Sequence, residues 1–329
     1  MISFRDVKIL MFSPYGATKH YGDAIKKELR RRGAFVNGYD ERPSQKTLSK
    51  IAIRFFKKSV PQIFNKYISK IIAQNKNVNF DYILICRGEA FNYQSIMLLR
   101  QAYPNAKIIF YLWDILKCTE VSDIIDICDK SMSFDPQDVD DNKALSFRPL
   151  FYIDAYLNIK NLTTKKHDCI FIGTLHSNRH TVISSLQKSF KEQGIDLYSY
   201  LYVPSRIVYI RDLLLKFPYI SPSKVYFEPM SLDDTIALLS SSIAIIDINY
   251  TNQKSLSSRA YEAMAARRKY ITTNPEVKKY DFYNPQNVAV IDLNNPILPD
   301  DFISSPFIPV PENILKKYSV EGLVDDLFS

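Results

Sequence analysis

The stretch SLSSRAYEAMAARRKYITTN, residues 255–274, reads as a polar loop, then a helix, then a strand ending in two threonines and an asparagine. The apolar strand pattern IAIIDINY (243–250) stands just before it. A helix between two apolar strands is the unit of parallel sheets, because a parallel crossover needs a dozen or more residues. The stretch therefore predicts one βαβ unit. Its helix also carries Arg259 and Glu262 on one face, which a helix that only fills a core does not need.

The same order of strand, loop and helix recurs along the chain. In the first half the strand patterns include VKILMFSP (7–14), FDYILICRG (80–88) and AKIIFYLWD (106–114). A helical pattern covers DAIKKELRRRG (23–33), in which Asp23 suits the N-cap. Near residue 150 the order restarts with HDCIFIGTLHSNRH (167–180). Strands alternating with helices predict parallel sheets that bind ligands at the carboxyl ends of their strands.

Length and composition support two domains. The chain has 329 residues, 46% of them hydrophobic, which is enough to bury two cores. We expect an α/β protein with a first domain over 1–155, a second over 156–312 and a C-terminal helix over 313–329. No apolar run is long enough to span a membrane, and the N-terminus reads as a first strand and not as a signal peptide. The four cysteines are scattered, which favours reduced thiols in the cytoplasm.

Several catalytic and nucleotide motifs are missing. The chain has only 8 glycines and contains neither GxGxxG nor GxxxxGK[ST], which argues against a dinucleotide oxidoreductase and a P-loop NTPase. It also lacks HExxH, GxSxG and a zinc-ligand cluster. The chemistry must therefore come from other residues.

Charge is concentrated near the N-terminus. The net charge is +8, but residues 1–75 hold 16 Lys and Arg against 5 Asp and Glu, so the rest of the chain is slightly acidic. Residues 44–72 resemble two amphipathic helices broken at Pro61, with basic and apolar faces. This pattern suits an anionic membrane surface or a lipid-diphosphate-linked acceptor, and the alternative is the solvated face of a packed helix. No recognisable fold supports nucleic-acid binding.

Three strand-end loops in the second half could bind a nucleotide. In IFIGTLHSNRH (170–180), a polar loop with an arginine precedes a helix, which suits a diphosphate; the alternative is an ordinary capped helix start. In SLSSRAYE, serines and Arg259 stand at another helix start, and Glu262 could accept from a ribose diol; the alternative is a capping box. Phe227 and Met230 could frame a base, although aromatic residues there more often fill a core.

Together these loops resemble the donor domain of B-type glycosyltransferases. The likeness rests on IFIGT…R, YLYVPS, FEPMSLDDTIALLSSSIAIIDI and SLSSRAYEAMAARRKYITTN in that order, with YLWD and SFDP…FRPLFYID from the first half, and it covers most of residues 80–295. The chain is most similar to bacterial enzymes of capsule and lipopolysaccharide synthesis. The resemblance implies two facing Rossmann-like domains with a cleft between them, the first for the acceptor and the second for a nucleotide-sugar donor.

The resemblance also implies roles for single residues. Glu262 would bind the ribose, and Phe227 and Met230 would frame the base. The remaining residues that we expect to bind the donor are Gly173, Thr174, His176, Arg179, Ser255, Ser258 and Arg259. Such enzymes need no metal and no cofactor besides the nucleotide-sugar substrate. Ser255 and Lys254 depart from the family pattern, in which a glycine and an acidic residue are usual.

Two carboxylates are candidates for the base that activates the acceptor. Glu89 in CRGEAF (86–91) and Asp114 in YLWD (111–114) each follow an apolar strand. A helix cap or a loop salt bridge is the alternative for either, and Arg87 stands close to Glu89 in the sequence. The function we expect is transfer of a sugar to a glycan or lipid-linked acceptor in the cytoplasm. The basic segment adds the expectation of a peripheral location on the inner face of the plasma membrane. Two alternatives are transfer of another nucleotide-activated group, such as glycerol phosphate, and a non-catalytic nucleotide- or glycan-binding homologue.

Overall fold

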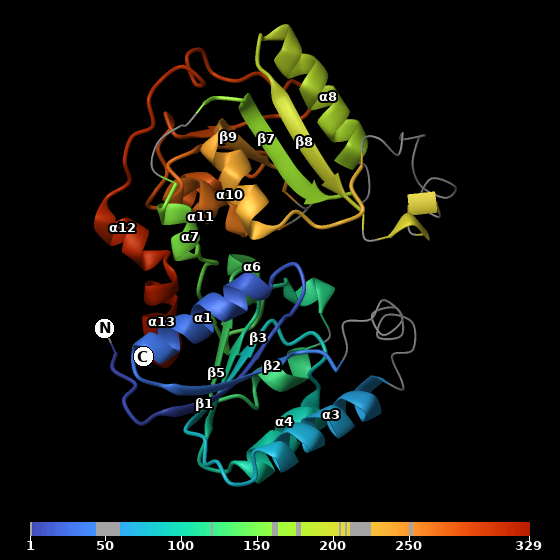
Figure 1. Ribbon diagram of the computed structural model, residues 1–329, viewed down its shortest axis with the longest axis vertical. Coiled ribbons are helices and arrows are strands. Elements are labelled where there is room, and N and C mark those ends of the chain that lie inside the picture. The colour runs from blue at the N-terminus through green and yellow to red at the C-terminus, as the bar shows by residue number, and fades with distance from the viewer. Residues whose placement is uncertain are drawn as a thin grey trace. The chain divides into compact units, whose positions relative to one another are not determined.

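The computed structural model divides the chain into two compact units (Figure 1). The first unit contains Met1–Leu150, Gln253–Ser255 and Val320–Ser329, and the second contains Phe151–Asn252 and Leu256–Ser319. The structure describes residues 2–43, 60–119, 121–159, 164–175, 179–203, 205–207, 209–210, 225–249 and 253–329.

The first unit is built on a parallel sheet with the strand order β2-β1-β3-β4-β5-β6. Its strands are β1 (Lys8–Ser13), β2 (Phe35–Asp40), β3 (Tyr82–Cys86), β4 (Lys107–Tyr111), β5 (Lys130–Ser133) and β6 (Leu145–Phe147). The central strands are almost fully buried, which is why their sequences are continuous apolar runs.

Helices cover the first sheet in two layers. Its helices are α1 (Lys19–Arg31), α3 (Val60–Gln74), α4 (Tyr93–Ala102), α5 (Ser122–Ile125), α6 (Pro136–Asp141) and α13 (Val320–Phe328), with a 3-10 turn η1 (Leu116–Cys118). α3 and α4 place Phe64, Ile68 and Ile96 in one core with Leu10 and Phe12 of β1. α1 packs against α13.

The second unit is built on a parallel sheet with the order β11-β10-β9-β7-β8. Its strands are β7 (His167–Thr174), β8 (Leu197–Tyr202), β9 (Ser242–Asp247), β10 (Lys269–Thr272) and β11 (Val288–Val290). Its helices are α7 (Asp154–Leu157), α8 (Arg179–Glu192), α10 (Leu232–Ser240), α11 (Ser258–Ala265) and α12 (Glu312–Lys317), with a 3-10 turn η3 (Pro275–Lys279). The expected α/β class with two parallel sheets is confirmed.

The strand order predicts where each sheet binds a ligand. In the first sheet the order reverses between β1 and β3, and in the second it reverses between β7 and β9. Loops on opposite sides of such a switch point diverge from each other, so they leave a crevice at the carboxyl ends of the two strands. Ligand chemistry is therefore expected beyond Ser13 and Cys86 in the first unit and beyond Thr174 and Asp247 in the second.

Several element boundaries differ from those that the sequence predicts. Asp23 does not cap α1: the helix begins at Lys19, and Asp23 pairs with that lysine one turn away at 3.1 Å. Tyr226 forms only an isolated bridge with Tyr202. The single C-terminal helix expected over 313–329 is two short helices, α12 and α13. Of the amphipathic segment 44–72, residues 44–59 lie outside the described part, and α3 holds Pro61 in its first turn.

Candidate functional site

The start of α11 is fixed to the carboxyl edge of the second sheet by Asp247, the last residue of β9. The Ser257 hydroxyl accepts a hydrogen bond from the Arg259 backbone N–H at 3.2 Å and so caps the helix. The same hydroxyl donates to the Asp247 carboxylate at 2.9 Å, and Tyr270 of β10 donates to it at 2.8 Å. Burial raises the pKa of Tyr270 well above its usual range, and the Asp247 charge adds to the effect.

Glu262 is buried one turn beyond this cap and forms an ion pair with Arg259. The Glu262 side chain is 1% exposed, whereas Arg259 is 23% exposed. Tyr156 of α7 reaches the same pair, and its pKa is raised first by burial and then by the Glu262 charge. A buried carboxylate needs such partners, because removing it from water otherwise costs several kcal/mol. A capping box is therefore excluded: Ser257 caps alone, and Glu262 pairs with an arginine.

Arg179 bridges the two strands at the switch point. Its guanidinium donates to the Thr174 carbonyl at 3.0 Å and to the Ile248 carbonyl at 3.3 Å, and it lies 5.6 Å from the Phe171 ring centroid. Burial lowers the pKa of Arg179. Gly173 is needed here, because a Cβ on it would lie 2.8 Å from the Phe171 ring. The arginine thus brings positive charge to the edge where Asp247 and the start of α11 also lie.

The structure also describes three other residues that were predicted to bind the donor, Ser258, Met230 and Phe227. Ser258 is half-buried in the first turn of α11, and Met230 is half-buried just before the cap of α10. Phe227 packs edge-on against Tyr209 and lies 5.5 Å from the Arg206 guanidinium. His176 lies outside the described residues.

Ser255 has a different environment. It is fully buried and belongs to the first unit, where its hydroxyl and its backbone N–H donate to one oxygen of Asp135 at 2.8 and 3.1 Å. The other oxygen of Asp135 caps α6 through the Gln137 N–H at 2.8 Å. The Ser255 hydroxyl is therefore already committed to a carboxylate.

Sequence reasoning missed Tyr156, Asp247 and Tyr270. Asp247 carried a usable signal, since it is an acidic residue at the carboxyl end of an apolar strand, as are the acids singled out in the first half. Tyr156 carried none, because its segment reads as a polar connection and only the fold brings it to Glu262.

In the first unit an ionic cluster lies where β2, β3 and β4 end. Arg87 forms ion pairs with the fully buried Glu41 and, at 3.0 Å, with Glu89. Arg42 also pairs with Glu89, and the Asp114 carboxylate lies 4.0 Å from Arg87. The structure thus brings both predicted catalytic acids to one guanidinium. The salt bridge between Arg87 and Glu89, which was the alternative for this acid, is present, so Glu89 is engaged by two arginines.

The charges of this cluster shift its titration. Loss of hydration raises the pKa of the half-exposed Asp114; Arg87 opposes the rise and Glu89 adds to it. Burial raises the pKa of Glu41 in the same way. Burial acts to lower the pKa of Arg87, but Glu41, Glu89 and Asp114 raise it overall. Arg87 also has a φ of 69°, a left-handed conformation that is strained in a residue other than glycine and is often found at functional sites.

The described residues contain neither a cluster of metal ligands nor a membrane-spanning helix. No group of three or more His, Cys, Asp or Glu among them is arranged to hold a metal ion. In the same part of the chain, no helix is both long enough and apolar enough to cross a bilayer.

Comparison with known proteins establishes the fold. The chain matches no protein-family model and no curated protein. Among solved structures it is similar to a glycosyltransferase from Rickettsia africae, with a TM-score of 0.53, 16% identity, and coverage of 98% of this chain and 88% of that chain. It is similar to a UDP-GlcNAc 2-epimerase from Methanocaldococcus jannaschii in complex with UDP-GlcNAc and UDP. The TM-score is 0.51 and the identity 11%, with coverage of 98% of this chain and 99% of that chain. It is also similar to MurG from Acinetobacter baumannii, with a TM-score of 0.50, 11% identity, and coverage of 98% of this chain and 99% of that chain.

At these identities the likeness concerns the fold alone. The chain has the glycosyltransferase B-type fold, with two Rossmann-like parallel sheets of six and five strands. One fold hosts several activities, so the function has to be argued from the site.

Proposed function

We propose that the protein is a glycosyltransferase that moves a sugar from a nucleotide-sugar donor to a glycan or lipid-linked acceptor. One observation carries the proposal: the start of α11, with the Glu262–Arg259 pair behind it, stands at the switch point of the second sheet. The fold agrees, because proteins of this fold include a named glycosyltransferase and an enzyme solved with UDP-GlcNAc. We place the reaction in bacterial surface polysaccharide synthesis, by the resemblance to capsule and lipopolysaccharide enzymes.

The donor would enter by an exchange of partners at the ion pair. Arg259 is the more exposed member, so it can turn from Glu262 to the diphosphate of the donor. Glu262 then keeps Tyr156 and gains the ribose hydroxyls in place of the guanidinium. The exchange avoids an unpaired buried carboxylate at either stage, which a simple removal of Arg259 would create.

The protein itself would balance the negative charge that develops on the leaving nucleotide. As the bond between the sugar and the diphosphate breaks, negative charge collects on the departing nucleotide. Arg179, Arg259 and the N–H groups at the start of α11 offer positive charge and donors at the sheet edge. We propose that the enzyme therefore needs no metal ion. Ser258, Thr174 and Gly173 would line the phosphate wall, and Phe227 and Met230 would frame the base.

On the acceptor side, we propose that Asp114 or Glu89 takes the proton from the attacking hydroxyl. Asp114 is the better placed of the two, because its raised pKa makes it a stronger base than an ordinary aspartate. Glu89 is held by two arginines and is less available.

The experiment is a screen of donors against a matched pair of variants. Wild type, Glu262→Gln and Glu276→Gln are mixed with UDP-, GDP-, CMP- and dTDP-sugars and with CDP-glycerol, with and without EDTA, and binding and donor hydrolysis are measured. We expect one nucleotide to bind, with an affinity about tenfold or more lower in Glu262→Gln because a neutral amide accepts hydrogen bonds from the ribose hydroxyls more weakly than the carboxylate does. Glu276, an acid of the same unit paired with Lys279, is the control and should change nothing.

The outcomes separate the alternatives. Release of free sugar and nucleotide diphosphate supports the transferase, whereas CDP-glycerol turnover would replace it with a glycerol-phosphate transferase. An altered sugar still attached to its nucleotide would indicate an epimerase. Binding without turnover of any donor would favour a non-catalytic homologue, and no binding at all would reject every nucleotide-dependent function. Loss of activity in EDTA would contradict the metal-free reaction.

We further propose that the enzyme works in the cytoplasm at the inner face of the plasma membrane, with residues 44–72 as the basic contact. The excess of positive charge in residues 1–75 supports this location, since anionic lipids attract basic segments by about 1 kcal/mol per residue.

A further inference from the structure

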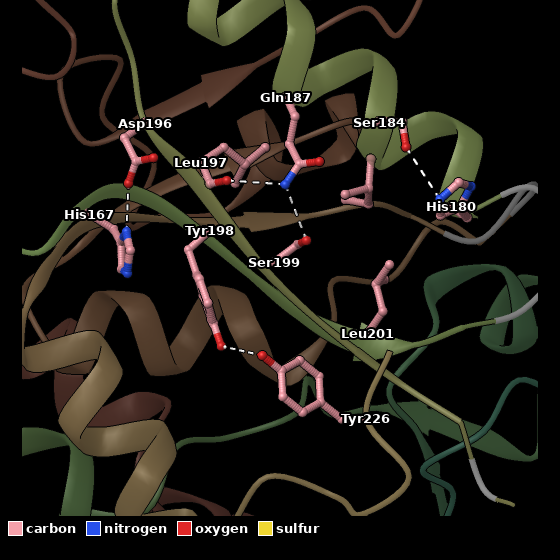
Figure 2. A pocket seen from close by; sticks show the side chains of 11 residues that line it. His167, His180, Ser184, Gln187, Asp196, Leu197, Tyr198, Ser199, Leu201 and Tyr226 are labelled. Carbon is pink, nitrogen blue, oxygen red and sulfur yellow. Dashed lines mark hydrogen bonds and ion pairs between the residues drawn. The ribbon is translucent and has the colours of Figure 1, made fainter. Parts of the chain in front are cut away.

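A cavity of about 280 Å³ lies in the second unit beside β8, the outermost strand of its sheet. Figure 2 shows its lining, which comes from the starts of β7 and β8, from α8 and from Tyr226. His167, which lines one end, stands at the amino end of β7, seven residues before Thr174. At 3.3 Å per residue of strand, these two residues are about 23 Å apart. This end of the cavity is therefore remote from the candidate donor site, whereas Tyr226 bridges Tyr202, the β8 partner of Thr174, at the other end.

Aromatic rings form one wall. The Tyr198 ring is stacked on the His167 imidazole, with centroids 4.8 Å apart, and the Tyr226 ring is stacked on Tyr200 at 3.8 Å. The Tyr198 and Tyr226 hydroxyls hydrogen-bond to each other at 3.1 Å, as Figure 2 shows. Each ring that lines the cavity is thus backed or tethered by another, so the wall is rigid before any ligand arrives. Tyr226 remains 38% exposed.

Planar polar groups form the rest of the lining. Asp196 holds the His167 Nδ1 at 2.5 Å and is itself 60% exposed, so it retains acceptor capacity toward the cavity. The Gln187 amide nitrogen donates to the Leu197 carbonyl and the Ser199 hydroxyl, both at 3.3 Å. The amide therefore offers a ligand its oxygen. Ser184 and His180 complete the polar side.

The charge of the lining excludes one ligand class. Among the described residues that line the cavity there is no lysine or arginine, and the one carboxylate among them is exposed, so a phosphate or a nucleotide would meet repulsion from it. The rings are stacked on each other and leave no slot between two parallel faces for a base. A neutral ring with one apolar face and hydroxyls around its edge matches what remains.

We propose that this cavity binds a neutral sugar ring, with Tyr226 against its apolar face and with Asp196 and Gln187 accepting from its hydroxyls. The site goes beyond the proposed function, because it would hold a sugar that carries no nucleotide, along the edge of β8. Burial raises the pKa of Tyr198 to about 12, so this phenol stays protonated and can both donate and accept.

The test uses sugars without any nucleotide. Glucose, galactose, N-acetylglucosamine and rhamnose are each mixed with the full-length protein, and saturation transfer from protein to sugar hydrogens is recorded by NMR. We expect transfer to at least one sugar, reduced about tenfold or more in Tyr226→Ala and in Asp196→Ala. Tyr202→Ala is the matched control, since this tyrosine ends β8 and does not line the cavity.

The variants also separate this site from the donor site. Glu262→Gln should leave sugar binding unchanged; if it abolishes binding while Tyr226→Ala does not, the sugar occupies the donor site and the proposal is overturned. No transfer to any of the four sugars also overturns it. If Tyr226→Ala lowers the unfolding temperature, Asp196→Ala decides, because its side chain is largely exposed and its loss does not open the core. Nucleotide binding with no sugar binding would reject the cavity alone and leave the proposed function intact.

Discussion

Asp114 is the residue whose chemistry the structure defines most sharply. Its raised pKa means that the carboxyl keeps its proton to a higher pH than an ordinary aspartate does, and a protonated carboxyl cannot accept the acceptor's proton. We therefore expect kcat/KM for the acceptor to rise with pH and to level off above this raised pKa. Asp114→Asn should lower kcat by roughly 10²–10⁴-fold at every pH.

Glu89 supplies the control for this prediction. Its charge contributes to the raised pKa of Asp114, so Glu89→Gln should move the acid limb of the pH profile to lower pH while most activity remains. If Glu89→Gln abolishes activity and Asp114→Asn does not, the base is Glu89. At this scale the sequence identified both acids, but it did not reveal that Arg87 joins them or that Glu41 holds Arg87 from the buried side.

At the scale of elements, α1 packs closely on β1 because Gly22 has no side chain. A Cβ at this position would lie 2.8 Å from the Ser13 Cβ, which is too close for both atoms to stay in place. In an open helix, Gly→Ala stabilises by about 1 kcal/mol. Here we expect Gly22→Ala to reduce the free energy of unfolding by about 1–3 kcal/mol, measured by urea denaturation.

The double variant with Ser13→Gly tests the cause. It removes the Cβ that the new alanine meets, so it should be more stable than Gly22→Ala alone. A double variant that loses the sum of the two single losses would show that the contact does not set the packing distance. The sequence predicted the helix and the strand themselves, since both patterns are local. It placed the helix start four residues late, because Asp23 suits a cap as well as it suits the pair with Lys19.

At the scale of the whole molecule, the charge is unevenly divided, and this division predicts membrane binding. We expect the full-length protein to sediment with vesicles containing anionic lipid. Neutralising Lys50, Arg54, Lys57 and Lys58 to glutamine should weaken this binding about tenfold or more, because each basic residue near the surface contributes about 1 kcal/mol. The matched control neutralises four exposed lysines of the second unit, namely Lys188, Lys191, Lys278 and Lys279. Equal binding by both variants and the wild type would contradict the proposed location.

The C-terminal residues pack against the N-terminal part of the chain. The last helix, α13, belongs to the first unit, where Asp325 pairs with Arg32 at 2.5 Å and Phe328 lies edge-on to Phe4 at 4.9 Å. Hydrogen bonds from Arg32 and the Ile2 N–H lower the pKa of Asp325 although burial acts to raise it. The sequence predicts a helix near the C-terminus but does not indicate where it packs.

The sequence alone determined the order of strands and helices and the parallel sheets, because alternation of apolar strands with amphipathic helices is written in short, contiguous patterns. It also placed Arg259 and Glu262 at a helix start beyond a strand. Only the tertiary structure decided their partners. Tyr156 reaches Glu262, Asp247 holds Ser257, and Arg179 reaches the Ile248 carbonyl from the start of α8. Such contacts join residues that are distant in sequence, and burial requires them because a polar group removed from water must find a partner wherever the fold supplies one.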